Sequence, residues 1–348
     1  MIQVNNRCIS SDSPVFIIAE AGVNHNGSLE MAERLVDLAA EAGADAVKFQ
    51  TFKADRFVTT TAPKALYQKE ATGSGESQYT MLKRLELSYE QHLELVEHCK
   101  TRNITFLSTP FDFDSVALLE KFNLPAYKIS SGDLTNLPFL EYIATKNKPI
   151  ILSTGMASLG EVEEAVAAIQ NTGNRQIVLL HCTSNYPTEY HDVNLKAMLT
   201  LRDAFQLPVG YSDHTVGMEV PIAAVALGAC VIEKHFTLDR SLPGPDHRAS
   251  MEPQELKLLV QKIRNTEAAL GTGLKQPTPS EKDTLSVARK SIVAAVDITS
   301  GTVVTERMLT FKRPGTGLPP KFLPYLIGRK ARKDLPSDKL LEITDFED

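Results

Sequence analysis

Apolar runs and amphipathic segments alternate along most of the chain. The amphipathic segments have apolar residues at helical spacing, as in residues 28–43, where Gly43 is placed to end the helix. Eight short apolar runs are rich in β-branched residues and bounded by turn residues, which is typical of strands. These runs cover residues 15–22, 46–52, 104–110, 126–133, 149–156, 177–184, 208–214 and 230–237.

Strict alternation of strands and helices predicts a parallel sheet, and eight such units over about 250 residues are typical of a closed (β/α)8 TIM barrel. A doubly wound open sheet is the alternative. The barrel is favoured because nearly every predicted strand ends in polar residues at its C-terminal end, where the active site of a barrel lies. These polar residues are Glu20, Lys48, Gln50, Ser108, Thr109, Lys128, Ser130, Ser131, Asp133, Ser153, Thr154, His181, Thr183, Ser212, His214, Glu233 and His235.

Three segments lie outside this alternation. Residues 59–79, between the second and third strands, are too many for a plain connection and predict a lid. Residues 271–286 are polar and contain prolines, which predicts a linker between a barrel domain, residues 1–270, and a small mostly β domain, residues 287–348. A domain this small is marginal alone, so we expect it to dock on another surface.

Composition argues against several classes of protein. The net charge of −6 disfavours nucleic acid or an anionic membrane as a partner. No apolar run approaches the roughly 20 residues of a membrane span, and the first residues lack the apolar region of a signal peptide. The four cysteines have no CxxC spacing, which indicates a reduced, cytoplasmic protein. Cys182 is interpreted as a small buried hydrophobe rather than as a nucleophile.

Two histidines form a candidate metal site. Side chains alternate faces along a strand, so Ser212 shares a face with His214, and Glu233 shares a face with His235. If the seventh and eighth strands are neighbours, the two imidazoles can hold one ion, such as Mn, Fe, Co or Zn. The alternative is that one or both histidines are core or general-acid residues.

A second group of strand-end residues suits an anion. An ammonium group surrounded by hydroxyl groups is what a phosphate or carboxylate needs, and no GxxxxGK[ST] loop indicates a nucleotide. Lys48 and Lys128 are interpreted as fixed cations, with a Schiff-base lysine as the alternative. The hydroxyl groups belong to Ser130, Ser131, Ser153, Thr154 and Ser212, and the carboxylates of unassigned role to Glu20, Asp133, Glu233 and Asp246. These patterns predict a metal-assisted enzyme acting on a phosphorylated or carboxylated small molecule.

A series of motifs, in order across almost the whole chain, resembles the sialic acid synthase family. That family joins phosphoenolpyruvate to an N-acylated mannosamine-type sugar. The last 60 or so residues resemble its small SAF (antifreeze-like, β-clip) domain, although an ice-binding role is disfavoured because the segment carries charges and no repeat. The motifs are FIIAEAGVNHNG, DAVKFQTF, STPFD, KISSGD, ILSTGM, HCTSNYP, VGYSDHT, CVIEKHFTLD, GPDHRAS and KRPGTG.

The resemblance implies roles for individual residues. His214 and His235 match the metal ligands, with Mn²⁺ as the expected ion and Mg²⁺ or Co²⁺ as alternatives. Arg313 matches an arginine that the small domain offers to the barrel of a partner subunit, which implies a domain-exchanged homodimer. Positions that hold phosphoenolpyruvate are matched by Lys48, Thr109, Lys128, Ser131, Ser153 and Ser212. Positions that engage the sugar or the chemistry are matched by Glu20, Tyr186 and Asp246, and we add Gln50 and Ser184 as substrate-binding residues and Asp133 and Glu233 as catalytic residues.

The expected reaction is condensation of phosphoenolpyruvate with N-acetylmannosamine to N-acetylneuraminate and phosphate, with cleavage of a C–O bond of phosphoenolpyruvate. The alternative is legionaminate synthesis from 2,4-diacetamido-2,4,6-trideoxymannose, and a more distant one is a Schiff-base aldolase. Departures from the family pattern bear on this choice. Asp133 stands where many relatives have Glu, Ser184 where some have Asn, and residues 48–52 read KFQTF where some N-acetylneuraminate-making relatives read KHQTH. Residues in this last segment are expected to face the sugar.

Overall fold

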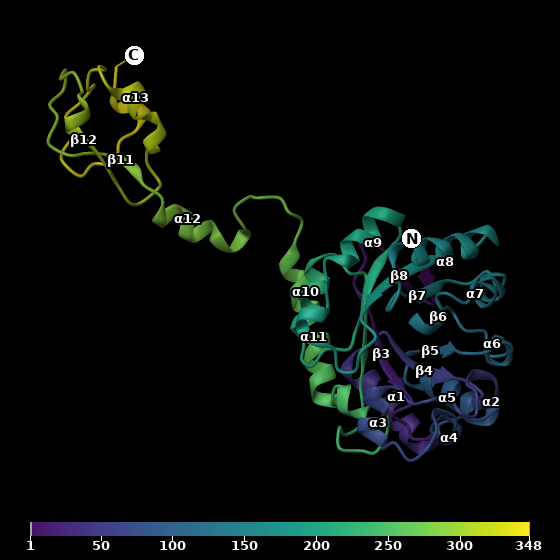
Figure 1. Ribbon diagram of the computed structural model, residues 1–348. Helices are drawn as coiled ribbons and strands as arrows, with labels where there is room; N and C mark the ends of the chain where they lie inside the picture. Colours follow the sequence, from purple (N-terminus) through teal and green to yellow (C-terminus); the bar gives the residue numbers. More distant parts are fainter. Residues whose placement is uncertain (1, 348) are drawn as a thin grey trace. The chain divides into compact units, whose positions relative to one another are not determined.

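The computed structural model describes residues 2–347, which divide into a larger unit ending at Gly271 and a smaller unit beginning at Thr272 (Figure 1). Eight parallel strands form one sheet in the order β5-β4-β3-β10-β9-β8-β7-β6. The two ends of this order, β5 and β6, contact each other, so the sheet is a barrel and the (β/α)8 prediction is confirmed. The strands are β3 (Phe16–Gly22), β4 (Ala46–Thr51), β5 (Thr105–Pro110), β6 (Tyr127–Ile129), β7 (Ile150–Ser153), β8 (Ile177–Cys182), β9 (Val209–Asp213) and β10 (Val231–His235).

Helices surround the strands (Figure 1). The first of them shows why these segments are helical: the Ser28 side chain accepts a hydrogen bond from Met31 N at its start, and Gly43, with a φ of 82°, ends it. Its apolar residues at helical spacing are buried against the sheet. The surrounding helices are α1 (Leu29–Ala42), α5 (Tyr89–Thr101), α6 (Phe113–Glu120), α7 (Leu137–Ala144), α8 (Leu159–Asn171), α9 (Ala197–Phe205), α10 (Glu219–Ala226) and α11 (Pro253–Leu270).

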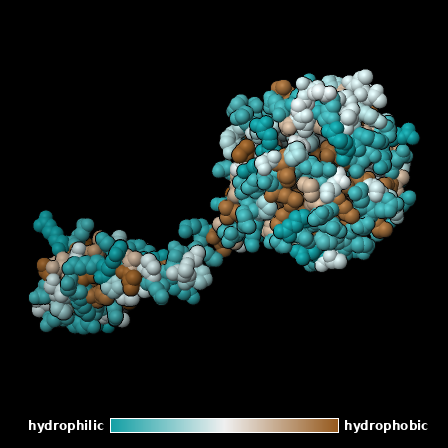
Figure 2. All heavy atoms as spheres, turned by 90° about the horizontal axis from the view of Figure 1, so that it is seen from below, coloured by the Kyte–Doolittle hydropathy of each residue, from teal (hydrophilic) through white to brown (hydrophobic). Residues whose placement is uncertain are grey.

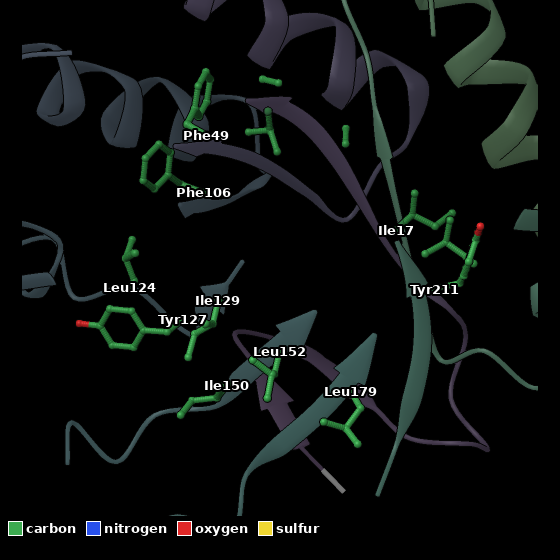
Figure 3. Packing of buried hydrophobic residues seen from close by; sticks show 14 of the residues in the cluster. Ile17, Phe49, Phe106, Leu124, Tyr127, Ile129, Ile150, Leu152, Leu179 and Tyr211 are labelled. Atoms are coloured by element: carbon green, nitrogen blue, oxygen red, sulfur yellow. The ribbon is translucent and has the colours of Figure 1, made fainter. Parts of the chain in front are cut away.

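Strand alternation divides the core into two layers. Residues facing the helices form the outer layer, part of which is seen in Figure 3, where Phe49 lies beside Phe106 at a ring-centroid distance of 5.8 Å. Residues facing the barrel axis, such as Phe16 and Ile151, form the inner layer. Ile2, Val4 and Ile9 of the hairpin β1 (Ile2–Val4) and β2 (Arg7–Ile9) pack against this inner layer. Towards the C-terminal ends of the strands the same inner face becomes polar, which places the site there.

The predicted lid, residues 59–79, is the middle of a longer folded insert, residues 54–83, which packs on an apolar cluster. It contains the short helices α2 (Ala54–Phe57), α3 (Leu66–Thr72) and α4 (Gln78–Lys83). Lys64, before α3, links to the segment after α3. Its buried ammonium group donates to the Gly73 carbonyl at 3.0 Å and lies 3.0 Å from Glu76. The cluster consists of Val23, Phe52, Ala54, Met81, Leu82 and Leu85, with Phe57, Val58, Tyr79 and Phe111 packed against it.

The smaller unit has a separate core. Strand β11 (Ser291–Ala294) pairs antiparallel with β12 (Leu309–Lys312), and the short helix α13 (Leu323–Leu326) follows. Helix α12 (Lys282–Ala288) occupies part of the segment predicted as a linker, whose residues from 271 to 283 are all exposed. The core residues are Ile292, Ala294, Ile298, Val304, Leu309, Leu326, Ala331, Leu335, Leu341 and Phe346.

No helix within residues 2–347 is long and apolar enough to cross a lipid bilayer. Figure 2 shows hydrophilic side chains over most of the surface in view, with smaller groups of hydrophobic side chains on both units. Scattered apolar residues at a surface are normal for folded proteins.

Candidate active site

The C-terminal ends of the barrel strands open into a cavity of about 380 Å³. Its size is in the range of small-molecule sites. Within the larger unit, all of the predicted site residues except Asp133 line it. These lining residues are Glu20, Lys48, Gln50, Thr109, Lys128, Ser131, Ser153, Ser184, Tyr186, Ser212, His214, Glu233, His235 and Asp246.

One predicted catalytic residue of the larger unit, Asp133, is not among the residues that line this cavity. Strand β6 ends at Ile129, and residues 131–133 turn into a 3-10 helix that takes Asp133 away from the strand tip. The Asp133 carboxylate accepts a hydrogen bond from Ser130 Oγ at 2.7 Å, so a structural role in the turn accounts for it. Arg313 belongs to the smaller unit, and its role stays a prediction.

Buried charges on strands β3, β4, β6 and β10 form one network on the inner face of the barrel. Lys48 Nζ lies 2.5 Å from Glu20 and 3.7 Å from Glu233, and Lys128 Nζ lies 3.6 Å from Glu233. Burial raises the pKa of Glu20 to about 7, against the opposing effect of Lys48. Burial would also raise the pKa of Glu233, but Lys128 and Lys48 outweigh it and lower that pKa to about 2. Glu233 therefore stays ionised and balances two buried ammonium groups.

Hydroxyl groups surround one side of this network. Lys128 Nζ donates to Ser153 Oγ at 2.7 Å, and Ser212 Oγ donates to Glu233 at 2.9 Å. Gly155 N donates to Ser131 Oγ at 2.9 Å. An ammonium group and several hydroxyl groups at one corner, with Ser131 held by the Gly155 amide, are suited to an oxyanion such as a phosphate or carboxylate.

The two predicted metal ligands lie on neighbouring strands. His214 follows β9 and His235 ends β10, and their ring centroids are 5.4 Å apart. His214 Nδ1 donates to the Thr183 carbonyl at 2.7 Å, which leaves the lone pair of Nε2 available, as in metal-binding histidines. His235 Nδ1 is buried without a hydrogen-bond partner, and burial lowers the pKa of His235 well below its usual value, so this ring is neutral.

These features fit a divalent metal ion better than they fit core histidines, because a buried ring nitrogen without a partner costs free energy. Within residues 2–347, no group of three or more His, Cys, Asp or Glu side chains is arranged to hold a metal ion. An ion bound here would therefore take two protein ligands, and water or substrate would complete its coordination.

Aromatic and sulfur groups complete the wall, and several were not predicted. Tyr186 lies between His214 and the insert, with ring centroids 4.0 Å from His214 and 4.9 Å from Tyr67. Cys182 also lines the cavity, with Sγ 3.8 Å from His214 Nδ1, so packing alone does not describe it. Asp246 is buried in the wall, which raises its pKa to about 6 against the opposing effect of His214.

The segment that reads KFQTF, residues 48–52, reaches the cavity through alternate side chains. Gln50 lines the cavity, but Phe49 packs in the outer layer against the helices, and Phe52 lies in the apolar cluster of the insert. Neither phenylalanine is among the lining residues. Strand alternation turns Phe49 away from the barrel axis, so this segment reaches the cavity through Lys48 and Gln50.

A profile of the NeuB family matches residues 35–275, well over half of the chain. The chain belongs to the NeuB family. A profile of the SAF domain matches residues 289–347, so the resemblance to sialic acid synthases and the expected small domain are both confirmed.

The proteins similar to this chain include synthases named for legionaminic, pseudaminic and N-acetylneuraminic acid. The chain is 53% identical to an N,N'-diacetyllegionaminic acid synthase of Campylobacter jejuni, over 93% of this chain and 98% of that protein. It is 50% identical to an N,N'-diacetyllegionaminic acid synthase of Legionella pneumophila, over 95% and 94% of the two chains. Among solved structures, an N-acetylneuraminic acid synthetase of Leptospira borgpetersenii in complex with citrate is 39% identical with a TM-score of 0.72, covering 82% of this chain and 94% of that chain.

Proposed function

We propose that this NeuB-family chain condenses phosphoenolpyruvate with 2,4-diacetamido-2,4,6-trideoxymannose to give N,N'-diacetyllegionaminate and phosphate. The observation that carries the reaction type is the anion-binding corner around Lys128, which shares one cavity with His214 and His235. The choice of sugar is supported by the two relatives that are about half identical, both diacetyllegionaminic acid synthases. N-acetylmannosamine, the acceptor expected from the sequence, has weaker support, from the synthetase of 39% identity.

The residues at the strand ends have distinct tasks in this proposal. Lys128, with Ser153 beside it, holds the phosphate of phosphoenolpyruvate, and Glu233 holds the two lysines in place. Glu20 lies 2.5 Å from Lys48, so this pair can pass a proton to or from the reacting groups. Asp246 accepts hydrogen bonds from the sugar. Holding both reactants in one cavity supplies much of the rate enhancement.

The proposed reaction forms one carbon–carbon bond and breaks one carbon–oxygen bond of phosphoenolpyruvate. Carbon 3 of phosphoenolpyruvate forms a bond to the aldehyde carbon of the open-chain sugar, and the aldehyde oxygen takes up a proton. Water adds to carbon 2 and loses a proton, and the bond between carbon 2 and the phosphate oxygen then breaks, which releases phosphate and leaves a keto acid. His214 and His235 would hold a divalent ion, Mn²⁺ by the family resemblance, which supplies Lewis-acid polarisation of the aldehyde when bound.

The proposal extends to the smaller unit. By the resemblance, Arg313 is offered to the barrel mouth of a second copy, in a domain-exchanged homodimer. The small size of this unit is consistent with a need for a docking surface.

Phosphate release with two sugars tests the proposed function. We expect kcat/KM with the diacetamido sugar to exceed that with N-acetylmannosamine by roughly 100-fold. A site that fits the diacetamido sugar lacks hydrogen-bond partners for the additional hydroxyl groups of N-acetylmannosamine. Initial rates with Mn²⁺ and saturating phosphoenolpyruvate measure this ratio. Preference for N-acetylmannosamine would indicate an N-acetylneuraminate synthase instead. Trapping of a lysine by borohydride, with no release of phosphate, would indicate the Schiff-base aldolase.

Gly155 provides a test of the anion-binding corner. A Cβ at this position would lie 2.4 Å from Ser184 Oγ and 2.8 Å from Ser131 Oγ. Gly155→Ala is therefore expected to displace these hydroxyl groups and to raise the KM for phosphoenolpyruvate roughly 10-fold, since one or two hydrogen bonds to an anion are lost. Steady-state kinetics with varied phosphoenolpyruvate measure the change. Gly160→Ala is the control, because a Cβ there meets nothing within 4 Å, and an equal effect of both would contradict the assignment.

A further inference from the structure

The insert contributes apolar residues to the cavity, which Val23, Phe111, Met156 and Pro245 also line. Phe57, Met81 and Leu82 line the same cavity as the buried lysines Lys48 and Lys128. These three side chains belong to the apolar cluster of the insert, and Met81 and Leu82 are 2% and 6% exposed. We call Phe57, Met81 and Leu82 the insert wall.

Polar groups of the insert near the cavity are engaged with each other. Gln68 Oε1 accepts hydrogen bonds from Ala65 N at 3.0 Å and from Gln78 Nε2 at 3.2 Å. Gln68 Nε2 donates to the Tyr67 hydroxyl at 3.3 Å. All four residues line the cavity, and these contacts engage Gln68 Oε1 and one N–H group each of Gln68 and Gln78 within the insert. The insert wall therefore presents carbon and sulfur atoms to a ligand.

The reacting end of the sugar cannot lie against this wall. The aldehyde must reach the strand ends, where His214, His235 and the anion-binding corner are. The insert follows strand β4 and brings its wall to the same cavity from outside the sheet. An open-chain six-carbon sugar whose carbon 1 is at the strand ends can therefore place carbon 6 against the insert.

We propose that the insert wall recognises the carbon 6 methyl group of a 6-deoxy sugar and thereby selects the acceptor. This inference rests on the proposed function and assigns its sugar specificity to Phe57, Met81 and Leu82. A methyl group buries well against such a wall. A hydroxymethyl group at carbon 6 would lose its hydrogen bonds to water without finding a partner. An apolar pocket rejects an added hydroxyl group by roughly 10- to 100-fold.

The test uses two sugars that differ only at carbon 6, 2,4-diacetamido-2,4,6-trideoxymannose and 2,4-diacetamido-2,4-dideoxymannose. For the unaltered protein we expect kcat/KM to be at least about 10-fold higher with the deoxy sugar. Leu82→Asn places an amide in the wall at similar volume, and we expect it to reduce the ratio to below about 3-fold, mainly through the sugar KM. The KM for phosphoenolpyruvate should stay unchanged.

Leu85→Asn is the matched control. Leu85 is 7% exposed in the same apolar cluster but does not line the substrate cavity, so its replacement costs similar stability without touching the sugar. The control should keep the wild-type ratio. If Leu82→Asn does not fold, Phe57→Tyr adds a hydroxyl group at the half-buried position of the wall and should also reduce the ratio.

The possible outcomes separate this inference from the proposed function. Equal rates with the two sugars, or a ratio unchanged in folded Leu82→Asn or Phe57→Tyr, would overturn the role of the insert wall while leaving the condensation intact. Absence of phosphate release with both sugars would overturn the proposed function itself, and the inference with it. A reduced ratio in Leu85→Asn as well as Leu82→Asn would show a general loss of packing and would also overturn it.

Discussion

Replacing His235 by Ala is expected to lower kcat/KM by at least about 10³-fold and to abolish tight binding of Mn²⁺. His235 is one of only two imidazoles in the cavity, and its buried Nδ1 has no hydrogen-bond partner within the part of the chain that the structure describes. With a single histidine left, an ion would lose half of its protein ligands. Lewis-acid polarisation of a carbonyl supplies several kcal/mol, and about 4 kcal/mol corresponds to 10³-fold in rate.

Two measurements separate a metal role from a structural one. Binding of Mn²⁺ followed by electron paramagnetic resonance should fail for His235→Ala, whereas far-UV circular dichroism should be unchanged. His181→Ala is the control, because His181 lies two strands away on β8, does not line the substrate cavity, and its Nε2 is 2.7 Å from the Val193 carbonyl. Full activity of His235→Ala with an unchanged requirement for metal would exclude the proposed site.

Lys234→Met is expected to lower the free energy of unfolding by about 3–5 kcal/mol, although Lys234 lies outside the active site. Lys234 and Asp213 are register partners on β10 and β9, and they face the helices. Lys234 Nζ lies 2.5 Å from the Asp213 carboxylate, and the two residues are 2% and 1% exposed. Removing the ammonium group leaves a buried carboxylate without its counter-charge. Such an uncompensated buried charge strongly destabilises the folded state.

Urea unfolding followed by far-UV circular dichroism measures this loss. Lys257→Met, at an exposed position of α11, should change stability by less than about 0.5 kcal/mol. The double variant Lys234→Met/Asp213→Asn should recover a large part of the loss, because the uncompensated charge is gone while the amide oxygen can still accept from Thr215 N, as Asp213 does at 3.0 Å. A double variant less stable than Lys234→Met would contradict this explanation.

Local patterns in the sequence were sufficient for the barrel and for most of the cavity. Side chains alternate along each strand, and the C-terminal ends of parallel strands meet at one end of a barrel. These two rules bring together residues as distant in the chain as Glu20, Lys128 and His235, without any knowledge of individual contacts. Motif resemblance then indicated the family, which the family match confirms.

Where the chain leaves regular strands, these rules fail. Asp133 was expected at a strand tip, but β6 stops at Ile129 and the following turn directs Asp133 to Ser130 instead. Residues 48–52 were expected near the sugar: Lys48 and Gln50 line the cavity, as strand alternation predicts, whereas Phe52, beyond the end of β4, packs within the insert.

The insert shows what tertiary structure alone decides. Its length predicted a lid, but its helices have only four, seven and six residues, too few for an apolar period to indicate a buried face. Which side chains reach the substrate cavity follows from how these helices pack on Val23, Phe52 and Phe111, from three separate parts of the chain. The pairing of Lys234 with Asp213 has the same origin. The sequence by itself thus determined the strands, their polar ends and the family, whereas the apolar wall and the buried ion pair depend on contacts between distant segments, which local periodicity does not encode.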